Sequence, residues 1–469
     1  MTLLTPVDLL DPRSLGPVHF IAIGGAGMSG IAAAYADLGV RVSGSDQADS
    51  ANLAMLRGHG VTTYVGHDAG QLGDAETVVV SSAVRESNPE LAEARSRGLR
   101  VWHRSAALGA LMLGRPGVAV GGTHGKTTTS AMIAHVLTAC GTDGGYVVGA
   151  PLATGESSRL GAPGSPFVVE ADESDGSFLQ YPAALRVVTN VEADHLDNWG
   201  TPEAYAEGFA RFAAGADGEA VVDIDDAGGA ALAAALGSHP LVTYGTSPDA
   251  DVRITDVSHD AAGVRGTILL AGVPVTLALG VPGLHNLANA TAALVVAARL
   301  GIDPQQAATA LAGFHGAHRR FEAVGEVGGV RVVDDYAHHP TEIDAVLAAA
   351  RDSVGEGRVI ACFQPHLYSR TRDFATGFGE ALAAADEVVL LDIYGAREEP
   401  MPGVTSALIG DVTTARLGPG RVHAASSLQD AAVVLAGLAR PGDIVLTVGA
   451  GDVTTVGPLV VRALAGVGR

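Results

Sequence analysis

Short runs of apolar residues recur along the 469-residue chain, and each is followed by a polar or glycine-rich turn and then by a helical stretch. The runs at 18–23, 117–120 and 330–335 each open such a series. Apolar strands that alternate with helices are typical of parallel sheets with helices packed on both faces. The pattern therefore predicts an α/β protein built from three units, the first of them doubly wound.

The predicted elements place three domains at residues 1–114, 115–317 and 318–469. Strands are expected at 18–23, 40–46, 78–82, 117–120, 167–170, 185–190, 330–335, 358–363, 387–391 and 443–448. Helices are expected at 31–38, 128–139 and 283–300. Three further segments of the central domain resemble antiparallel additions to its sheet: 218–224, 251–256 and 264–279.

Composition narrows the class of protein. Hydrophobic residues make up 47% of the chain, which is ample for several cores, and the net charge of −22 argues against a nucleic-acid or anionic-membrane binder. Cys140 and Cys362 are far apart in sequence and indicate neither a disulfide framework nor a zinc site. Residues 1–16 lack the basic segment of a signal peptide, and the best apolar stretch, 267–281, is interrupted by Gly and Pro. We expect a soluble cytoplasmic protein.

Only one of the 29 lysine and arginine residues is a lysine, and it lies in the turn Gly122-Thr123-His124-Gly125-Lys126-Thr127-Thr128. In such a turn backbone N–H groups surround nucleotide phosphates, the lysine reaches the β- and γ-phosphates, and the first hydroxyl binds Mg²⁺. A compositional bias toward arginine explains why lysine is rare, but not why the remaining lysine lies here. The common Walker pattern would have glycine at Val120, so this shorter loop indicates a narrower class of nucleotide-binding protein.

Another glycine-rich turn, the first along the chain, lies near the N-terminus. Its glycines fit Gly25-x-Gly27-x-x-Gly30, and Asp46 follows about 20 residues on. This spacing is typical of a turn that holds a diphosphate at a helix N-terminus, with an acid for a ribose hydroxyl. It does not say which nucleotide carries the diphosphate, and a purely structural tight turn is the alternative.

Two acidic segments, 170–175 and 190–197, each follow an apolar strand of the central domain. Acids at the carboxyl ends of parallel strands are well placed to hold Mg²⁺ beside phosphates. We interpret Glu173 and His195 as the metal-binding members. Solvated loop acids or helix caps are the alternative for most of the others.

Polar positions in the last third of the chain suggest further contacts. Asn286 and Asn289 share one face of a helix, where an amide meets an adenine edge, although Asn286 is also a plausible N-cap. Arg320 lies at a domain junction, where arginine clamps a transferring phosphoryl group; a surface linker is the alternative, more so for Arg319. The strand-end segments 334–340 and 364–372 carry histidines and arginines that suit an amino acid carboxylate, or are ordinary loop residues.

Taken together, these motifs resemble the Mur ligase family over nearly the whole chain, and within it the branch that adds alanine. The resemblance is carried by segments 23–30, 122–127, 170–175, 189–192, His285-Asn286 with Asn289, and 334–340. It implies a Rossmann-like N-terminal domain, a central P-loop-type ATPase domain and a Rossmann-like C-terminal domain. It also implies an ATP- and Mg²⁺-dependent ligase of peptidoglycan synthesis that joins L-alanine to the lactyl carboxylate of UDP-N-acetylmuramate through an acyl phosphate. A monomer or weak homodimer is expected.

The resemblance also assigns residues to ligands. It implies that the UDP-sugar contacts Gly25, Ala26, Gly27, Met28, Ser29, Asp46, Ser82 and Arg104. For ATP it implies Gly122, Thr123, His124, Gly125, Lys126, Thr127, Thr128, Asn286, Asn289, Arg320 and Asp335. For the metal it implies Thr127, Glu173 and His195, and for the amino acid His338 and Arg370. Lys126, Arg320 and His338 are the expected catalytic residues.

Two departures bear on the branch and on the alanine site. Related ligases use a carbamoylated lysine, and no lysine follows Lys126 in this chain, as expected for the alanine-adding branch. Some members carry Arg at the position of Leu367, so the carboxylate contact is left to Arg370 or Arg372. The rival hypotheses are a ligase that attaches a recycled peptide, an NAD-dependent oxidoreductase and an ATP-gated binding protein.

Overall fold

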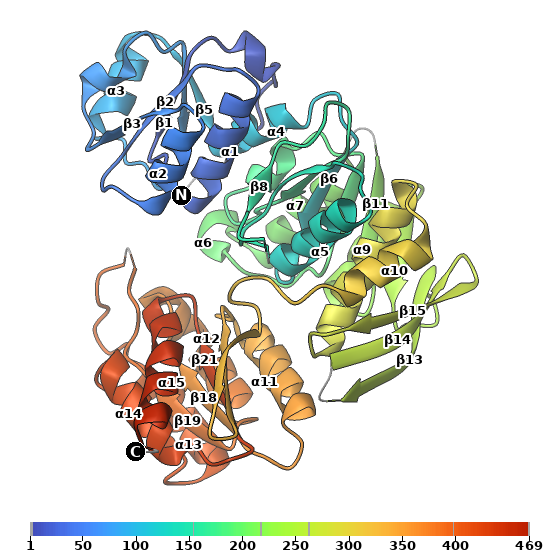
Figure 1. Cartoon of the computed structure of the whole chain (residues 1–469), viewed down its shortest axis with the longest axis vertical. Helices are drawn as coiled ribbons and strands as arrows, with labels where there is room; N and C mark the ends of the chain where they lie inside the picture. Colours follow the sequence, from blue (N-terminus) through green and yellow to red (C-terminus); the bar gives the residue numbers. More distant parts are fainter. Residues whose placement is uncertain (1–2, 153, 216–217, 261–262, 397, 468–469) are drawn as a thin grey trace. The chain divides into compact units, whose positions relative to one another are not determined.

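The computed structural model describes residues 3–152, 154–215, 218–260, 263–396 and 398–467. The chain divides into two compact units. Figure 1 shows its helices and strands, coloured by residue number. The first contains residues up to 255 together with 267–276 and 288–311, and the second contains 256–266, 277–287 and the chain from 312 onward. Each unit is described by itself.

The N-terminal sheet of the first unit has five parallel strands in the order β3-β2-β1-β4-β5. The strands are β1 (Val18–Ile21), β2 (Val42–Asp46), β3 (Thr62–Val65), β4 (Thr77–Val80) and β5 (Arg100–His103). The helices are α1 (Ala26–Asp37), α2 (Ala51–Gly58), α3 (Pro89–Ser96) and α4 (Arg104–Leu111). The strand order reverses between β1 and β4, and the carboxyl ends of strands at such a point form the usual ligand crevice of an open α/β sheet.

The central sheet has ten strands in the order β15-β14-β13-β12-β11-β10-β6-β9-β7-β8. Its strands are β6 (Gly117–Gly121), β7 (Gly145–Val147), β8 (Ser158–Arg159), β9 (Phe167–Glu170), β10 (Leu185–Val188), β11 (Glu219–Asp223), β12 (Leu241–Gly245), β13 (Val252–Asp260), β14 (Gly263–Leu270) and β15 (Val273–Leu279). The helices are α5 (Lys126–Ala139), α6 (Leu196–Trp199), α7 (Pro202–Ala213), α8 (Ala227–Leu236), α9 (Leu284–Arg299) and α10 (Pro304–Ala312). Strand β6 pairs in parallel with β9 and β10, so the loops after these three strands meet at one edge.

The C-terminal sheet belongs to the second unit and has the order β16-β17-β21-β18-β19-β20. Its strands are β16 (Glu322–Val327), β17 (Val330–Asp335), β18 (Val359–Phe363), β19 (Glu387–Leu390), β20 (Val422–Ala424) and β21 (Ile444–Val448). Only β16 among these described strands is antiparallel to its neighbour. Two apolar cores lie on opposite faces of the sheet, formed with α11 (Pro340–Val354), α12 (Tyr368–Leu382) and α13 (Ala407–Leu417) on one face and with α14 (Leu428–Leu438) and α15 (Val456–Val467) on the other.

The structure confirms the three-domain α/β prediction, with a sheet for each domain, but corrects several elements. Helix α1 begins at Ala26 rather than 31 and α5 at Lys126 rather than 128. The glycines of α1 lower helix propensity, yet close packing requires one of them, because a Cβ on Gly30 would lie 2.8 Å from the Ser158 side chain.

The antiparallel prediction was wrong for two of its three segments. Strand β11 is parallel to both β10 and β12, and β13 begins parallel to β12. Segment 264–279 is two strands, β14 and β15, joined by the turn at Ala271-Gly272; a two-residue connection requires an antiparallel pair. Both cysteines are free, as expected. Within the described ranges, each helix is too short or too polar to cross a membrane.

Candidate functional site

The second glycine-rich loop connects β6 to α5 and is held tightly by the strand beside it. Gly122 has φ +136°, and a Cβ there would lie 1.9 Å from Thr189 Oγ1, so only glycine fits. The backbone N–H of His124 donates to Asn190 Oδ1 at 2.8 Å, and Thr123 Oγ1 donates to the Glu192 carbonyl at 2.8 Å. The loop therefore presents its remaining N–H groups at the N-terminus of a 14-residue helix, the usual site for phosphate.

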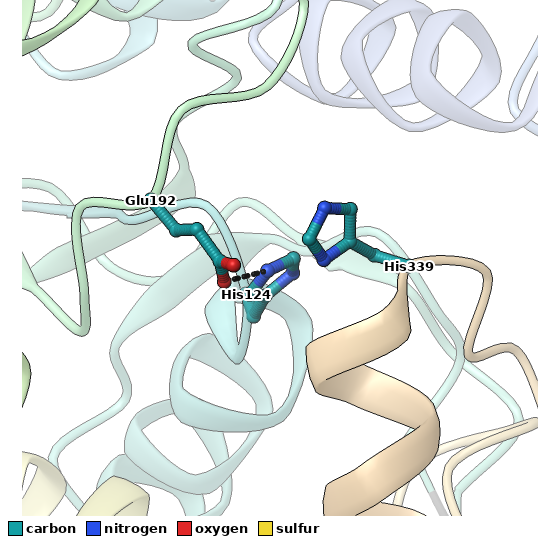
Figure 2. Close-up of side chains that lie close together, drawn as sticks. All are labelled: His124, Glu192 and His339. Atoms are coloured by element: carbon teal, nitrogen blue, oxygen red, sulfur yellow. Dashed lines mark hydrogen bonds and ion pairs between the residues drawn. The ribbon is translucent and has the colours of Figure 1, made fainter. Parts of the chain in front are cut away.

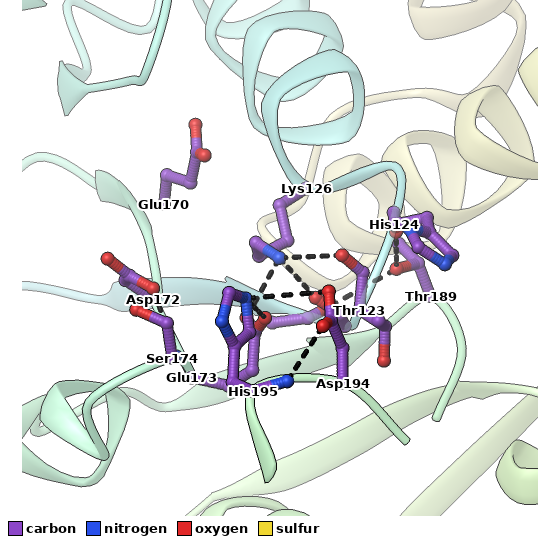
Figure 3. Close-up of polar contacts among 12 residues, drawn as sticks. Thr123, His124, Lys126, Glu170, Asp172, Glu173, Ser174, Thr189, Asp194 and His195 are labelled. Carbon is purple, nitrogen blue, oxygen red and sulfur yellow. Dashed lines mark hydrogen bonds and ion pairs between the residues drawn. The ribbon is translucent and has the colours of Figure 1, made fainter. Parts of the chain in front are cut away.

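Lys126 is held by this loop and by an acidic neighbour (Figure 3). Its Nζ donates to the carbonyls of Gly122 at 2.6 Å and Thr123 at 2.9 Å, and it lies 2.8 Å from Glu173 Oε2. Burial lowers the pKa of Lys126, but the Glu173 carboxylate outweighs burial and raises the pKa above its usual value. Burial raises the pKa of Glu173. The ammonium is thus charged and held at the N-terminus of α5 by two carbonyls and one carboxylate.

A hydroxyl–carboxylate pair lies beside the lysine. Thr127 Oγ1 donates to Glu170 Oε1 at 2.9 Å, and the other oxygen of Glu170 accepts the N–H of Gly149 at 2.7 Å. His195 has φ +52°, and its Nε2 lies 3.9 Å from Glu173 Oε1 and 3.6 Å from Asp194 Oδ2. The structure thus pairs Thr127 with Glu170, and it places His195 near Glu173.

His124 forms a second pair at the same edge of the sheet. Its Nε2 lies 3.1 Å from Glu192 Oε2, as the dashed line in Figure 2 shows. Because Glu192 is two residues beyond Asn190, one strand end holds both the backbone and the side chain of His124. This contact orients the imidazole beside the phosphate loop.

The first glycine-rich loop is built differently. The N–H of Gly24 donates to Asp46 Oδ2 at 2.8 Å, and Asn52 Nδ2 donates to the Gly24 carbonyl at 2.7 Å. Met28 and Ser29 are buried in α1, so contacts from this turn would come from backbone N–H groups. One oxygen of Asp46 is already used to hold the loop, a role that spacing alone did not indicate.

Arg104 and Ser82 flank this first loop, and both are held by the acidic segment of the central domain. Arg104 Nη1 lies 3.6 Å from the Cβ position of Gly27, and its Nη2 donates to Asp172 Oδ2 at 2.9 Å. Ser82 Oγ donates to Asp175 Oδ2 at 2.7 Å. Burial raises the pKa of Asp172, but Arg104 and Ser174 lower it more, to about 2. Segment 172–175 therefore contacts both glycine-rich loops, through Arg104 and through Lys126.

The two predicted adenine-facing asparagines are both buried. Asn289 Oδ1 accepts from Thr129 Oγ1 at 3.0 Å, and a Cβ on Gly125 would lie 2.9 Å from it, so Asn289 lies against the phosphate loop. Asn286 Nδ2 donates to the Pro282 carbonyl at 2.7 Å. Asn286 lies within α9 rather than before it, so the N-cap interpretation is wrong.

In the second unit, residues predicted to bind ATP and the amino acid lie near the C-terminal ends of β17 and β18. Asp335 accepts the N–H groups of Phe321 at 2.7 Å and Ala337 at 2.8 Å, and burial raises its pKa to about 6. The guanidinium of Arg320 lies 5.1 Å from the Tyr336 ring centre. Arg370 is buried near His338, whose pKa burial lowers to about 4.

The neighbours of these residues correct two interpretations. Arg319 is not a surface linker residue, because its Nε donates to Asp334 Oδ2 at 2.9 Å and its Nη2 to the Gly449 carbonyl at 2.5 Å. Arg372 is exposed and donates to Asp373 at 2.7 Å, whereas Arg370 is buried, which favours Arg370 for the carboxylate. Leu367 precedes α12 with φ +71°.

The sequence interpretation did not select Glu170, Asn190 or Arg319. Glu170 and Asn190 were within quoted motifs, and their position at strand ends was the available signal. Arg319 carried no comparable signal, because its partners lie 15 and 130 residues away.

Three family models match successive parts of the chain. They are the Mur ligase family, catalytic domain (17–115), the Mur ligase middle domain (120–297) and the Mur ligase, glutamate ligase domain (319–451). Together they cover most of the sequence.

Curated relatives and solved structures agree with these matches. The chain is 57% identical to a UDP-N-acetylmuramate–L-alanine ligase of Cutibacterium acnes, over 99% of this chain and 100% of the relative. An enzyme of the same name from Thermobifida fusca is 51% identical over 99% and 100%. The crystal structure of UDP-N-acetylmuramate-alanine ligase MurC from Thermotoga maritima has a TM-score of 0.78 at 29% identity, covering 96% of this chain and 99% of that one. A murein peptide ligase from Psychrobacter arcticus has a TM-score of 0.69 at 25% identity, with 96% and 98% covered.

Proposed function

Because the chain belongs to the Mur ligase family, we propose that it is an ATP-dependent ligase that joins L-alanine to the lactyl carboxylate of UDP-N-acetylmuramate in peptidoglycan synthesis. The observation that carries the proposal is Lys126, partly buried on a shortened glycine loop and paired with Glu173. High identity to alanine ligases over the full chain supports the substrate, and it favours alanine over a recycled peptide or a nicotinamide cofactor.

The reaction proceeds in two steps. A lactyl carboxylate oxygen attacks the γ-phosphorus of ATP, ADP leaves, and the carboxylate becomes an acyl phosphate. The amine nitrogen of alanine then attacks the acyl carbon, the amine loses a proton, and inorganic phosphate leaves with its C–O bond electrons. Phosphoryl transfer depends on positioning and charge neutralisation, so the first step falls to Lys126 and to the N–H groups of the loop.

The donor set beside Lys126 fits a magnesium ion. Mg²⁺ prefers oxygen ligands in an octahedron at about 2.0–2.1 Å, in which neighbouring oxygens lie about 2.9 Å apart. Thr127 Oγ1 and Glu170 Oε1 are 2.9 Å apart, and the carboxylate of Glu173 and the imidazole of His195 lie on the next loops. We therefore assign Mg²⁺ to Thr127, Glu173 and His195, with Glu170 beside them. A bound Mg²⁺ would neutralise charge on the phosphate oxygens.

The first glycine-rich loop is proposed to hold the UDP diphosphate at the N-terminus of α1, near Gly27, because the N–H groups of Met28 and Ser29 already donate to the Gly25 carbonyl. Arg104 supplies the positive charge that the loop itself lacks, and Ser82 lies at the end of β4, across the crevice from β1. The free oxygen of Asp46 is available to a ribose hydroxyl. This arrangement supports a diphosphate ligand.

The second unit is proposed to supply the amino acid site. His338 is neutral at pH 7 because its pKa is about 4, and its Nδ1 lies 3.1 Å from the Tyr336 carbonyl, so Nδ1 donates and Nε2 is left as a proton acceptor. Arg370 would bind the alanine carboxylate. Arg320 and Asp335 are proposed for the γ-phosphate and the ATP ribose. The enzyme is expected to work in the cytoplasm as a monomer or weak homodimer.

The proposal is tested by phosphate release from ATP and UDP-N-acetylmuramate, with alanine, glycine, serine and the stem tripeptide assayed in parallel. Alanine should give the largest kcat/KM, and omission of the UDP-sugar should abolish release. Preference for the tripeptide would assign the chain to peptide recycling instead. Absence of release with every amino acid, together with NADH consumption, would support an oxidoreductase.

A further inference from the structure

Glu90 is a buried acid that the proposed mechanism does not use. It lies in the first turn of α3, and its side chain has 0% exposure. One carboxylate oxygen, Oε2, accepts from Ser45 Oγ at 2.6 Å and lies 2.9 Å from His67 Nδ1. The other, Oε1, lies 3.3 Å from His19 Nε2. Burying an ionised carboxylate costs free energy unless it is paired and hydrogen-bonded. Glu90 has such partners in three other segments, and the role of this network needs an explanation.

The partners of Glu90 lie next to the residues that shape the first glycine-rich loop. Ser45 directly precedes Asp46, whose Oδ2 accepts the N–H of Gly24 at 2.8 Å. His67 directly follows Gly66, whose N–H donates to the Asp46 carbonyl at 2.8 Å. Ser45 and His67, the two residues that Glu90 contacts, are therefore adjacent in sequence to residues that make or receive the hydrogen bonds of Asp46.

The same network also reaches the strand that leads into the loop. The Ser45 carbonyl accepts the N–H of Ile23, one residue before Gly24, at 2.9 Å. His19, in β1, has its second ring nitrogen, Nδ1, 2.9 Å from Ser43 Oγ in β2. Glu90 thus links α3 to both strands and to the turn after β3.

Protein groups already surround the carboxylate, because one Glu90 oxygen is shared by a serine hydroxyl and a histidine ring nitrogen and the other faces His19. A role in stability alone would need no relation to Asp46. Buried pairs often contribute little net stability relative to apolar residues, and orientation is their better attested use.

We propose that Glu90 is a positioning residue for UDP-sugar binding. Through Ser45 and His67, Glu90 fixes Asp46 and the turn at Gly24. This inference rests on the proposed function, because it takes the first glycine-rich loop as the diphosphate site. The carboxylate touches no substrate; it sets the position of the oxygen that holds the loop. Loss of the Glu90 charge should weaken UDP-sugar binding and leave ATP binding by the central domain unchanged.

The test compares Glu90→Gln with Glu387→Gln, a matched control in the second unit. Glu387 is also buried and paired, with Arg421 Nη1 at 2.7 Å and His423 Nε2 at 3.1 Å. Glu90→Gln should raise the KM for UDP-N-acetylmuramate about tenfold and change kcat and the KM for ATP less than about twofold. Glu387→Gln should lower Tm without moving the KM for the UDP-sugar.

Two further measurements keep the outcome decisive. Combining Glu90→Gln with Asp46→Asn should raise that KM by less than the product of the single effects, because both changes disturb one contact. If Glu90→Gln does not fold, Ser45→Ala should still raise the KM about threefold, since it removes one link of the same chain. An unchanged KM, or an equal rise in Glu387→Gln, overturns the inference. Failure of the unmodified enzyme to turn over UDP-N-acetylmuramate would instead overturn the proposed function.

Discussion

The loop at residues 24–30 and the loop at residues 121–127 each follow a central strand of a parallel sheet and lead into a helix, α1 or α5. The later loop carries its own cation, Lys126, whereas the earlier loop has none and lies beside Arg104 of α4. Both cations are paired with one acidic segment, Arg104 with Asp172 and Lys126 with Glu173. Loops of similar backbone placement are therefore served by different cations, and a shared acidic segment holds both cations.

The largest expected effect separates the two loops completely. Lys126→Met should lower kcat for phosphate release by at least about 10²–10³-fold, because a donor to the transferring phosphoryl group is lost. Isothermal titration should show that UDP-N-acetylmuramate still binds. Because the change leaves Glu173 buried without its cation, Lys126→Met with Glu173→Gln is the control for folding. If a folded double variant lost both phosphate release and UDP-N-acetylmuramate binding, the two loops would not have separate roles.

Glycine substitutions test the backbone of each loop. Gly122→Ala should cost roughly 2–4 kcal/mol of unfolding free energy, because φ is +136° and the Cβ would meet Thr189 Oγ1. Gly27→Ala should not lower Tm, because the nearest atom to its Cβ is Arg104 Nη1 at 3.6 Å and alanine favours the helix more than glycine does. It should nevertheless weaken UDP-N-acetylmuramate binding about tenfold, since a methyl group obstructs close approach of the diphosphate. Equal Tm losses would show that the loops are equally strained.

Thr127 tests whether the metal belongs to the second loop alone. Thr127→Val keeps the shape but removes the hydroxyl that donates to Glu170. It should lower kcat/KM for ATP by about 10–100-fold and raise the Mg²⁺ concentration needed for half-maximal rate. Thr127→Ser should retain most of the activity. A normal Mg²⁺ requirement in the valine variant would remove Thr127 from the metal site.

The smallest effect concerns the acid dependence of the pair beside the first loop. The pKa of Asp172 is about 2 in the folded chain, below its value in the unfolded chain, so the pair stabilises the fold above about pH 4. That stability is lost as pH falls through 2. Since the Asp172 side chain is 35% exposed, screening limits the contribution to about 1 kcal/mol.

Thermal denaturation from pH 5 to pH 2 should show a shallower loss of Tm in Asp172→Asn than in the unmodified chain. Asp143→Asn, which removes an exposed pair with Arg159, is the control. An identical slope in the Asp172 variant would show that Arg104 does not hold this carboxylate in solution.

The parts predicted from sequence are those encoded over a few neighbouring residues. Residues 122–127 join a glycine turn, a lysine and a hydroxyl, so the phosphate loop needs no tertiary information to be recognised. The strand ends near Glu173 and His195 were found in the same way, because parallel strands place their carboxyl ends together. Spacing alone did not select Glu170 or Asn190, since their roles depend on β6 lying between β9 and β10.

Contacts between distant segments account for the rest. Asp46 fits a ribose-binding spacing, yet it also holds Gly24, and Glu90 reaches it through a serine and a histidine from other elements. The start of α1 was predicted too late because glycine lowers helix propensity. In the structure the helix includes Gly30, which packs against Ser158. Parallel pairing of β11 was missed because strand direction is set by the intervening helix α7 rather than by the strand residues.

Helix α5 begins at Lys126 and is capped at its far end by Cys140, which is partly exposed, whereas Cys362 is fully buried. Fourteen residues of α-helix span about 21 Å, so the phosphate loop and an accessible thiol lie at the two ends of one rigid rod. A fluorophore attached to Cys140 would therefore sit at a known spacing from a labelled nucleotide. Energy transfer between that fluorophore and the nucleotide would then report the distance between the two ends of α5.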